Sequence, residues 1–230
     1  NKNKIEIFKP TGSKRKNFLS PTSIDSSYKY ISNWNIENKN HWTFFSNSSF
    51  IETNNGNVTK IKFPEKAQNI SISPNKNQIA YTLDNNLFFA NSTDSIIAIT
   101  KNESKEIISG QAIHRFEFGI SKGIFWSPNS NKIAFYEKDE SDVADYPLLD
   151  INKTPGKLKS IKYPMAGQNS EYGKVGIYDL KSKKTIYLNV KNNKDDYVTN
   201  LTWGPDSKYI YIAELNRDQN HLKWNKFSSE

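Results

Sequence analysis

The chain of 230 residues contains no cysteine, one methionine and only three histidines. Without cysteine it can form no disulfide bond, no thiolate metal site and no cysteine nucleophile. His41, His114 and His221 lie far apart, and no His-Glu-x-x-His spacing occurs, which excludes that class of zinc peptidase. No apolar run approaches the roughly 18 residues of a membrane span. We therefore expect no metal, no cofactor and no membrane span in this chain.

Apolar residues are also scarce, at 35% of the chain, yet aromatic residues reach 13%. Because disordered chains are poor in aromatics, this composition indicates a folded core. At about 150 residues per domain, the length predicts one large domain or two small ones. The chain opens at Asn1 with neither methionine nor an apolar leader, which favours a mature form or a fragment.

Basic residues outnumber acidic ones by 32 to 24, which gives a net charge of +8. A protein that binds nucleic acid gathers such charge into one patch. Here only two short clusters occur, at 14–16 and 181–184, and the other lysines alternate with acids. We expect no nucleic acid as a partner, and a basic nucleic-acid-binding β domain is the weakest of three function classes considered.

Alternation of polar and apolar residues dominates the sequence. It is clearest in four segments, at 132–137, 174–180, 184–190 and 208–215. β-Branched and aromatic residues at period two are typical of strands, and no long stretch has the period of a helix. The sequence therefore predicts an all-β protein.

A short motif recurs along the chain, as Ser-Pro-Asn at 73–75, Ser-Pro-Asn at 127–129 and Gly-Pro-Asp at 204–206. Polar residues, an isoleucine and an alternating strand follow each copy. Proline fixes φ for a turn and Asn or Asp tolerates its second half, so each copy predicts a turn between antiparallel strands. A fourth, degenerate unit is expected at 34–51.

Strand–turn–strand units that repeat every 40–50 residues or so are typical of β-propeller blades. We predict about four blades of four-stranded antiparallel sheets, with 138–172 as a polar, irregular insertion over one face. A closed propeller has at least about four blades, and a partial one exposes strand edges. The chain is thus a small closed propeller or, as we prefer, part of a larger one.

One pattern imitates a catalytic motif. Gly119–Gly123 satisfies Gly-x-Ser-x-Gly, in which a serine nucleophile sits between a strand and a helix. Here a strand and a turn follow, and His221 is the only downstream histidine. Ser121 is therefore rejected as a nucleophile.

The segment 110–128 places His114, Arg115 and Glu117 among aromatic residues. A carboxylate in apolar surroundings loses solvation and gains from a cationic partner. Glu117 is therefore either an anchor for a ligand ammonium or half of an ordinary ion pair. Neighbouring aromatics are open to two interpretations as well, as walls of a substrate cavity or as packing between blades: Phe116, Phe118, Trp126 and Tyr136.

Four stretches occur in a recognisable order: 110–141, Tyr-Pro-Met-Ala-Gly at 163–167, Val-Gly-Ile-Tyr-Asp-Leu at 175–180, and 197–227 with its Asn-Arg-Asp-Gln-Asn run. Together they resemble the N-terminal propeller of the dipeptidyl peptidase IV family of serine peptidases. Within that family, the sequence most resembles the Bacteroidetes-type dipeptidyl and prolyl tripeptidyl peptidases. The resemblance covers residues 65–227 and is weak over 1–64.

This resemblance implies that residues 1–230 belong to an eight-bladed propeller, joined to a C-terminal α/β-hydrolase domain that carries a Ser-Asp-His triad and is absent here. It implies Glu117 as the anchor of the substrate α-amine. We expect the neighbouring Arg115 to be a second substrate-binding residue. Many family members have Glu-Glu where this sequence has Phe116-Glu117. The family also uses an arginine from an earlier blade to bind a substrate carbonyl. The equivalent region of this sequence offers only Lys62 or Lys66, and lysine lacks the guanidinium fork.

The implied function is that of a propeller that gates substrate access in a dipeptidyl or prolyl tripeptidyl peptidase cutting after a penultimate proline or alanine. The expected partners are peptides with a free N-terminus, the hydrolase domain and a second copy in a homodimer. The expected location is the periplasm, the cell surface or the medium. Alone, the chain lacks a triad and should be inactive. The alternative is a stand-alone propeller that binds a ligand without catalysis.

Overall fold

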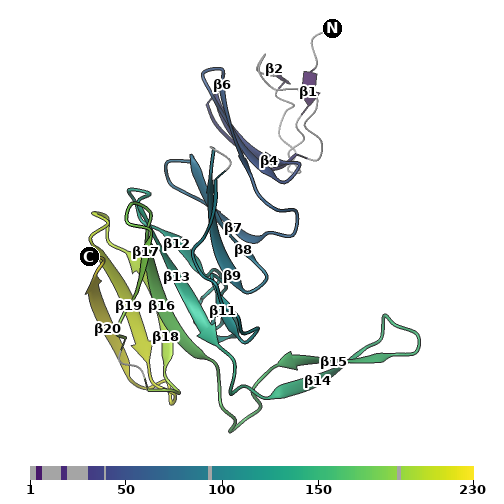
Figure 1. The fold of residues 1–230 in the computed structure, drawn as a ribbon, viewed down its shortest axis with the longest axis vertical. Helices are drawn as coiled ribbons and strands as arrows, with labels where there is room; N and C mark the ends of the chain where they lie inside the picture. The colour runs from purple at the N-terminus through teal and green to yellow at the C-terminus, as the bar shows by residue number, and fades with distance from the viewer. Residues whose placement is uncertain (1–3, 7–16, 20–30, 39, 93–94, 191–192) are drawn as a thin grey trace. The chain divides into compact units, whose positions relative to one another are not determined.

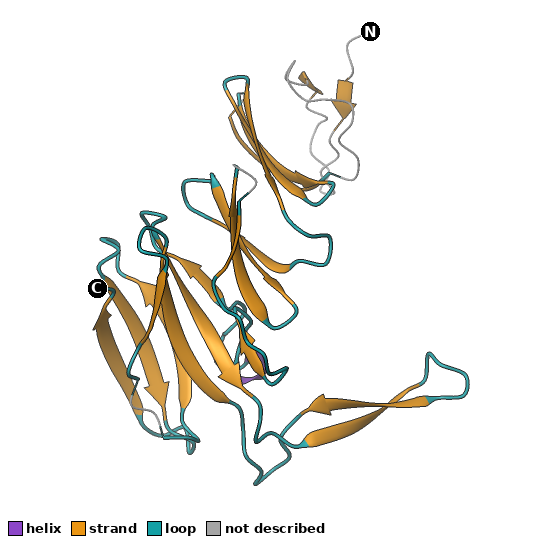
Figure 2. Ribbon diagram, in the orientation of Figure 1, coloured by secondary structure: helices purple, strands orange, loops and turns teal. Residues whose placement is uncertain are grey.

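The structure, a computed structural model, describes residues 4–6, 17–19, 31–38, 40–92, 95–190 and 193–230. The basic cluster at 14–16 lies outside these residues. Strands account for nearly all of the regular structure, and a single 3-10 segment, η1 (His114–Phe116), is the only helical element among the described residues (Figure 2). The all-β prediction is confirmed. The chain divides into two units, residues 1–65 with 90–95 and residues 66–89 with 96–230.

The first unit contains a four-stranded antiparallel sheet whose strands follow one another in chain order (Figure 1): β3 (Ser32–Asn38), β4 (His41–Ser46), β5 (Ser49–Asn54) and β6 (Asn57–Lys62). Phe44, Phe50 and Ile61 are buried in it. The ring of Trp34 stacks on Phe44, with centroids 5.1 Å apart. This is the degenerate unit predicted at 34–51, and it extends to residue 62. A separate pair joins β1 (Lys4–Glu6) and β2 (Asn17–Leu19).

Three further sheets lie wholly or mostly in the second unit. One has the spatial order β10-β9-β8-β7, with β7 (Gln68–Ile72), β8 (Gln78–Leu83), β9 (Asn86–Asn91) and β10 (Ile96–Ala98). The next, which we call the central sheet, is built from β11 (Ile107–Ser109), β12 (Ile124–Trp126), β13 (Lys132–Asp139), β16 (Tyr172–Asp179) and β17 (Lys184–Tyr187). The last comprises β18 (Tyr197–Trp203), β19 (Tyr209–Leu215) and β20 (Leu222–Ser228).

These sheets agree with an open, partial propeller of about four blades. The expected four strands per blade hold for the sheets β3–β6 and β7–β10. The central sheet has five strands, because two short strands share one edge of β13. The sheet β18–β20 has three strands among the described residues.

The recurring Pro-containing motifs form the same turn each time. In the first two copies the amide of the serine before proline donates to a carbonyl five residues on, from Ser73 to Gln78 and from Ser127 to Lys132, both at 2.9 Å. Gly204 and Tyr209 make the equivalent bond at 2.8 Å. The residue after Asn or Asp takes the left-handed backbone conformation in every copy, with φ near +60° at Lys76, Ser130 and Ser207.

The repeat also provides the contacts between neighbouring sheets of the second unit. Trp126 donates from its indole nitrogen to the Ser71 carbonyl at 3.1 Å, and Trp203 donates to the Phe125 carbonyl at 2.9 Å. Each acceptor lies two residues before the Ser-Pro of the preceding copy. The two tryptophans therefore have the structural role that their recurrence indicates.

Alternation along β13 fills two cores at once. Ile133 and Phe135 pack with residues of the β7–β10 sheet, whereas Ala134 and Tyr136 pack with residues of the β18–β20 sheet. Because neighbouring residues of a strand point to opposite faces, a strand between two sheets must be apolar at successive positions. The sequence Ile-Ala-Phe-Tyr at 133–136 meets that demand.

The insertion at 138–172, predicted as irregular, contains two strands of its own. β13 continues to Asp139 and β16 begins at Tyr172, while β14 (Asp145–Asp150) and β15 (Lys157–Lys162) form a two-stranded antiparallel ribbon (Figure 1). The ribbon buries little, since Leu149 and Leu158, which face each other, are 62% and 78% exposed. Its sequence therefore lacks the alternation that identified the other strands, which is why the pattern was interpreted as loop.

Candidate functional site

Residues 110–123, which we call the site loop, interrupt one edge of the central sheet. Ser109 of β11 lies opposite Glu137 and Ile124 of β12 lies opposite Phe135, so the two short strands follow each other along β13. Tyr136, between those partners, closes the base of the loop: its carbonyl accepts from the Gly110 amide at 2.8 Å and its amide donates to the Gly123 carbonyl at 3.0 Å. The loop thus leaves and rejoins the sheet at one point.

The tip of the site loop has a left-handed backbone. φ is +51° at His114, +54° at Arg115, +64° at Phe116 and +55° at Phe118. Residues with a Cβ rarely adopt such angles, and surrounding contacts must hold them there. Inside the tip the Glu117 amide donates to the His114 carbonyl at 2.9 Å. The result is a tight turn that leaves Phe116 70% exposed and Glu117 exposed.

His114 fixes one side of this turn. Its side chain is 1% exposed, and its Nε2 accepts a hydrogen bond from the Val198 amide at 3.0 Å. Burial and the nearby Lys138 ammonium lower the pKa of His114 to about 4, so the ring is neutral at pH 7. Because Nε2 accepts, the proton of the neutral ring is assigned to Nδ1.

Phe118 fixes the other side of the turn. Its ring packs on Tyr197 at a centroid distance of 4.8 Å, and His114 meets the same tyrosine edge-on at 5.2 Å. The guanidinium carbon of Arg217 lies 5.8 Å from the centre of the Tyr197 ring. Arg217, the arginine of the Asn-Arg-Asp-Gln-Asn run, therefore lies over the Tyr197 ring, which in turn contacts the site loop.

A group of four charged side chains, which we call the charge cluster, lies under the tip: Arg115, Lys138, Glu140 and Glu171. Lys138 donates to Glu140 at 2.9 Å. The Glu171 carboxylate accepts from the His114 amide, and its other oxygen lies 3.8 Å from the Lys138 ammonium. Two positive and two negative charges therefore balance in a largely buried place.

Arg115, expected to bind substrate, belongs to this cluster. One terminal nitrogen lies 3.5 Å from Glu140 Oε1, and Nε lies 3.9 Å from Glu171 Oε2. The side chain is 30% exposed, and its guanidinium carbon lies 5.7 Å from the centre of the Tyr163 ring. The structure thus brings the Tyr-Pro-Met-Ala-Gly stretch to the site loop, although 48 residues separate Arg115 from Tyr163 in the chain.

Glu117, expected to anchor an amine, stands apart from the cluster. Its residue is exposed, whereas the sequence suggested an apolar environment among aromatics. The difference arises because the left-handed turn directs residues 116 and 117 away from the core. Within the described residues its carboxylate makes no hydrogen bond or ion pair. The interpretation of Glu117 as half of an ordinary ion pair therefore finds no partner residue there. A carboxylate held on a fixed loop and open to solvent can accept hydrogen bonds from a ligand ammonium.

The remaining candidates are distributed between core and surface. Ser121 lies on the returning limb of the site loop, and β12 follows it in place of a helix, as expected when it was rejected. Trp126 packs against the core with the β7–β10 sheet and Tyr136 is 1% exposed. Of the four aromatics, only Phe116 is largely open to solvent.

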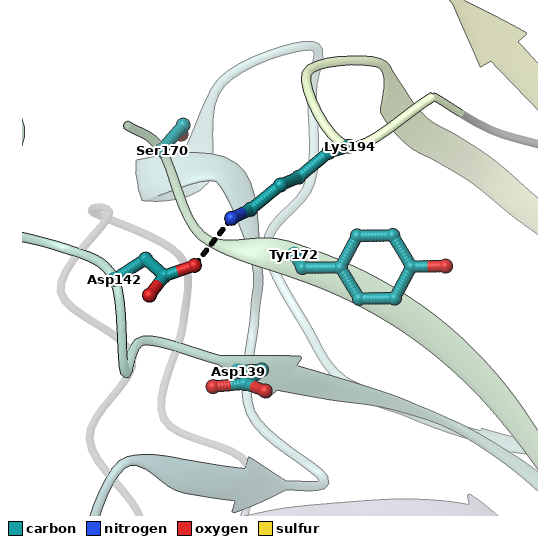
Figure 3. Close-up of a pocket in the computed structure, with 5 residues that line it drawn as sticks. All are labelled: Asp139, Asp142, Ser170, Tyr172 and Lys194. Atoms are coloured by element: carbon teal, nitrogen blue, oxygen red, sulfur yellow. Dashed lines mark hydrogen bonds and ion pairs between the residues drawn. The ribbon is translucent and has the colours of Figure 1, made fainter. Parts of the chain in front are cut away.

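The second unit also has a pocket of about 270 Å³ (Figure 3). It is lined by Asp139, Asp142, Ser170, Tyr172 and Lys194. Lys194 and Asp142 form an ion pair that raises the pKa of Lys194. Figure 3 shows this pair together with the Tyr172 ring. The described part of the chain holds no group of three or more His, Cys, Asp or Glu side chains arranged for a metal ion.

Sequence reasoning missed the charge cluster. Lys138 and Glu140 follow a predicted strand, and Glu171 lies in the segment interpreted as an irregular insertion. Glu171 stands 57 positions from the His114 amide that it binds. No local pattern links residues so far apart, and only the pairing of β13 with β16 brings them together.

Comparison with known proteins shows which family the chain matches. The family model described as the dipeptidyl peptidase IV (DPP IV) N-terminal region matches residues 23–230. Dipeptidyl aminopeptidase B of Saccharomyces cerevisiae is 28% identical over 183 residues, which covers 73% of this chain and 22% of that protein.

Two solved structures are similar as well. A crystal structure from Bacteroides ovatus, assigned as a dipeptidyl aminopeptidase IV, has a TM-score of 0.74 and 42% identity, and the match covers 83% of this chain and 26% of that one. Dipeptidyl peptidase 4 of Porphyromonas gingivalis has a TM-score of 0.72 at 20% identity, over 93% of this chain and 35% of that one, and supports the fold alone. The chain therefore spans between about a fifth and a third of the length of these relatives.

Among the described residues no helix is long and apolar enough to cross a membrane.

Proposed function

The chain belongs to the dipeptidyl peptidase IV N-terminal region family, and from this premise we propose that it gates substrates and binds their N-termini within a serine exopeptidase. The whole protein would release dipeptides after a penultimate proline or alanine, or tripeptides after a proline in the third position. A C-terminal α/β-hydrolase domain, outside this chain, would supply the Ser-Asp-His triad. The propeller region would admit only unfolded peptides and set the distance between the amine and the cut.

The observation that carries the proposal is the Glu117 carboxylate, exposed at the tip of a loop whose base and both sides are fixed. A protonated α-amine offers three N–H donors, and charge-assisted bonds to a carboxylate are about twice as strong as neutral ones. Because an ion that loses its water without gaining a partner is strongly disfavoured, an acylated N-terminus would bind poorly. A single carboxylate in place of Glu-Glu is sufficient for this discrimination.

Arg115 is the second substrate-binding residue in the proposal. Its partly exposed guanidinium lies beside Tyr163, and Arg115 precedes Glu117 by two positions in the chain. A guanidinium can donate to a peptide carbonyl close to the anchored amine. Its neighbours Glu140 and Glu171 hold it in place, so that binding a neutral carbonyl leaves the charge balance of the cluster unchanged.

The test uses the full-length protein and two chromogenic substrates, Gly-Pro-p-nitroanilide and Ala-Ala-Pro-p-nitroanilide, each with a free or an acetylated amine. We expect cleavage of a free-amine substrate and a rise in KM of about tenfold or more in Glu117→Gln, because one charge-assisted bond contributes about 1.5–3 kcal/mol. Glu103→Gln, which alters another exposed glutamate of the same unit, is the matched control.

Each outcome decides between the alternatives. Equal kinetics for Glu117→Gln and the wild type would leave a peptidase without this anchor. Equal cleavage of free and acetylated substrates would remove the exopeptidase assignment. Failure to cleave any prolyl substrate would favour the stand-alone binding module.

Two further parts of the proposal follow from the family. We propose a second copy of the protein as a partner, and a location in the periplasm, at the cell surface or in the medium. Sedimentation velocity of the full-length protein tests the first, and fractionation of the producing cells tests the second. A monomer at micromolar concentration, or a cytoplasmic protein, would contradict them.

A further inference from the structure

Glu171 is a buried carboxylate to which the proposed function gives no role beyond its contact with Arg115. It immediately precedes β16, and its side chain is 1% exposed. Oε1 accepts a hydrogen bond from the His114 amide at the tip of the site loop. Oε2 lies 3.9 Å from Arg115 Nε and 3.8 Å from Lys138 Nζ, and has no hydrogen bond within the described part of the chain.

A charge buried in this way lowers the stability of the fold unless a partner compensates for its lost hydration. A buried carboxylate loses its hydration, and removal of either member of a buried pair leaves the other unpaired. Glu140 already pairs with Lys138 at 2.9 Å and lies 3.5 Å from Arg115. Glu171 differs from Glu140 because it alone also binds the backbone of the site loop. The contact that distinguishes it is therefore the one to the loop tip.

That contact continues to Glu117 through a single residue, His114. Glu171 accepts from the amide of His114, and the carbonyl of His114 accepts from the amide of Glu117 at 2.9 Å. His114 has a φ of +51°, an angle that a residue with a side chain adopts only when its surroundings impose it. A buried carboxylate that accepts from its amide is such a constraint. Arg115, next in the chain, is constrained by the same carboxylate.

We propose that Glu171 is a positioning residue: it holds the left-handed tip of the site loop so that the Glu117 carboxylate meets the α-amine of the substrate. The inference rests on the proposed role of Glu117. Glu171 itself touches no substrate, because it is buried beneath the loop. It acts through the His114 peptide and through Arg115, and its loss displaces Glu117 without removing its charge.

The experiment is a double-mutant cycle in the full-length protein, with KM and kcat measured on a free-amine prolyl substrate. Glu171→Ala should raise KM about tenfold at unchanged kcat, because a small misplacement of a binding group is costly. In Glu171→Gln the amide oxygen still accepts from His114, so the rise in KM should be smaller. In the Glu117→Gln background, Glu171→Ala should raise KM by a smaller factor than in the wild type, because only the part that acts through Arg115 remains.

Glu214→Ala is the matched control. Glu214 is also a buried carboxylate, accepts from Asn225 at 3.2 Å and lies 3.8 Å from Lys223, but it belongs to β19 and does not touch the site loop. It should lower the melting temperature as Glu171→Ala does, while leaving KM unchanged. Should Glu171→Ala fail to fold, Glu171→Gln carries the test in the same cycle.

Three results would overturn the inference. One is an unchanged KM in both Glu171 variants. Another is an equal rise in KM with and without Glu117, which would show that Glu171 acts elsewhere. The third is a rise in KM for Glu214→Ala, which would reduce the effect to general destabilisation. An unchanged KM in Glu117→Gln alone would instead defeat the proposed function, and the two failures are thereby distinguished.

Discussion

Adding one methyl group at Gly123 should open the base of the site loop. A Cβ at this position would lie 2.1 Å from the carbonyl oxygen and 2.5 Å from the amide nitrogen of Gln111. Both are backbone atoms and cannot rotate away, and contacts under 3.0 Å are essentially never seen. In Gly123→Ala the two limbs of the loop must therefore separate by at least 0.9 Å, the difference between 3.0 and 2.1 Å.

The magnitude follows from what this separation disturbs. Tyr136 binds Gly110 and Gly123 through its carbonyl and amide, and two hydrogen bonds of about 1 kcal/mol each are weakened when the limbs part. Overpacking adds about 1 kcal/mol or more. We expect a loss of about 2–3 kcal/mol in the free energy of unfolding of this region. At about 2–4 °C per kcal/mol, the melting temperature falls by about 4–12 °C.

The assay is thermal melting of the full-length protein, followed by tryptophan fluorescence, together with KM for a free-amine prolyl substrate. KM should rise because the loop presents Glu117. Gly119→Ala is the control: Gly119 has a φ of +73° but no atom within 4 Å of an added Cβ, so only backbone strain of about 1–2 kcal/mol is added. Wild-type melting of Gly123→Ala, or equal damage from Gly119→Ala, would refute the reasoning from close approach.

The other predictions concern pH and the contacts between sheets. The folded-state pKa of His114 is about 4 against 6.5 in the unfolded chain, so the folded protein binds fewer protons between these values. Its stability therefore rises with pH through this window, and acidification from pH 7 to pH 4 removes about 3 kcal/mol. His114→Gln, which keeps an acceptor for the Val198 amide, should flatten melting temperature against pH, and an unchanged slope would contradict this origin. Trp203→Phe loses the bond to the Phe125 carbonyl, costs about 1 kcal/mol and should lower the melting temperature by a few degrees; an unchanged melting temperature would show that this bond is not stabilising.

Much of the fold could be predicted from local patterns in the sequence. Strand alternation, the recurring Ser-Pro-Asn turn and the degenerate unit near Trp34 each depend on residues within one hairpin, so the sequence alone predicts an all-β chain with repeated blades. Trp126 and Trp203 each stand directly before a copy of the turn motif, and they make equivalent contacts because a repeated blade repeats its contacts. The β14–β15 ribbon was missed, since an exposed ribbon needs no apolar alternation.

The sequence also identified the site loop, and the motifs around Glu117 indicated the family that the comparison confirms. The conformation of that loop could not be predicted from the sequence. Left-handed angles at His114, Arg115 and Phe116 contradict the preferences of these residues, and contacts from distant segments impose them. Glu171 reaches His114 only because β13 and β16 pair, and Tyr136 closes the loop only because β11 and β12 share an edge of β13. Local propensity determined the strands and turns of this protein, whereas the exposure of Glu117 was decided by tertiary contacts that no neighbouring residue encodes.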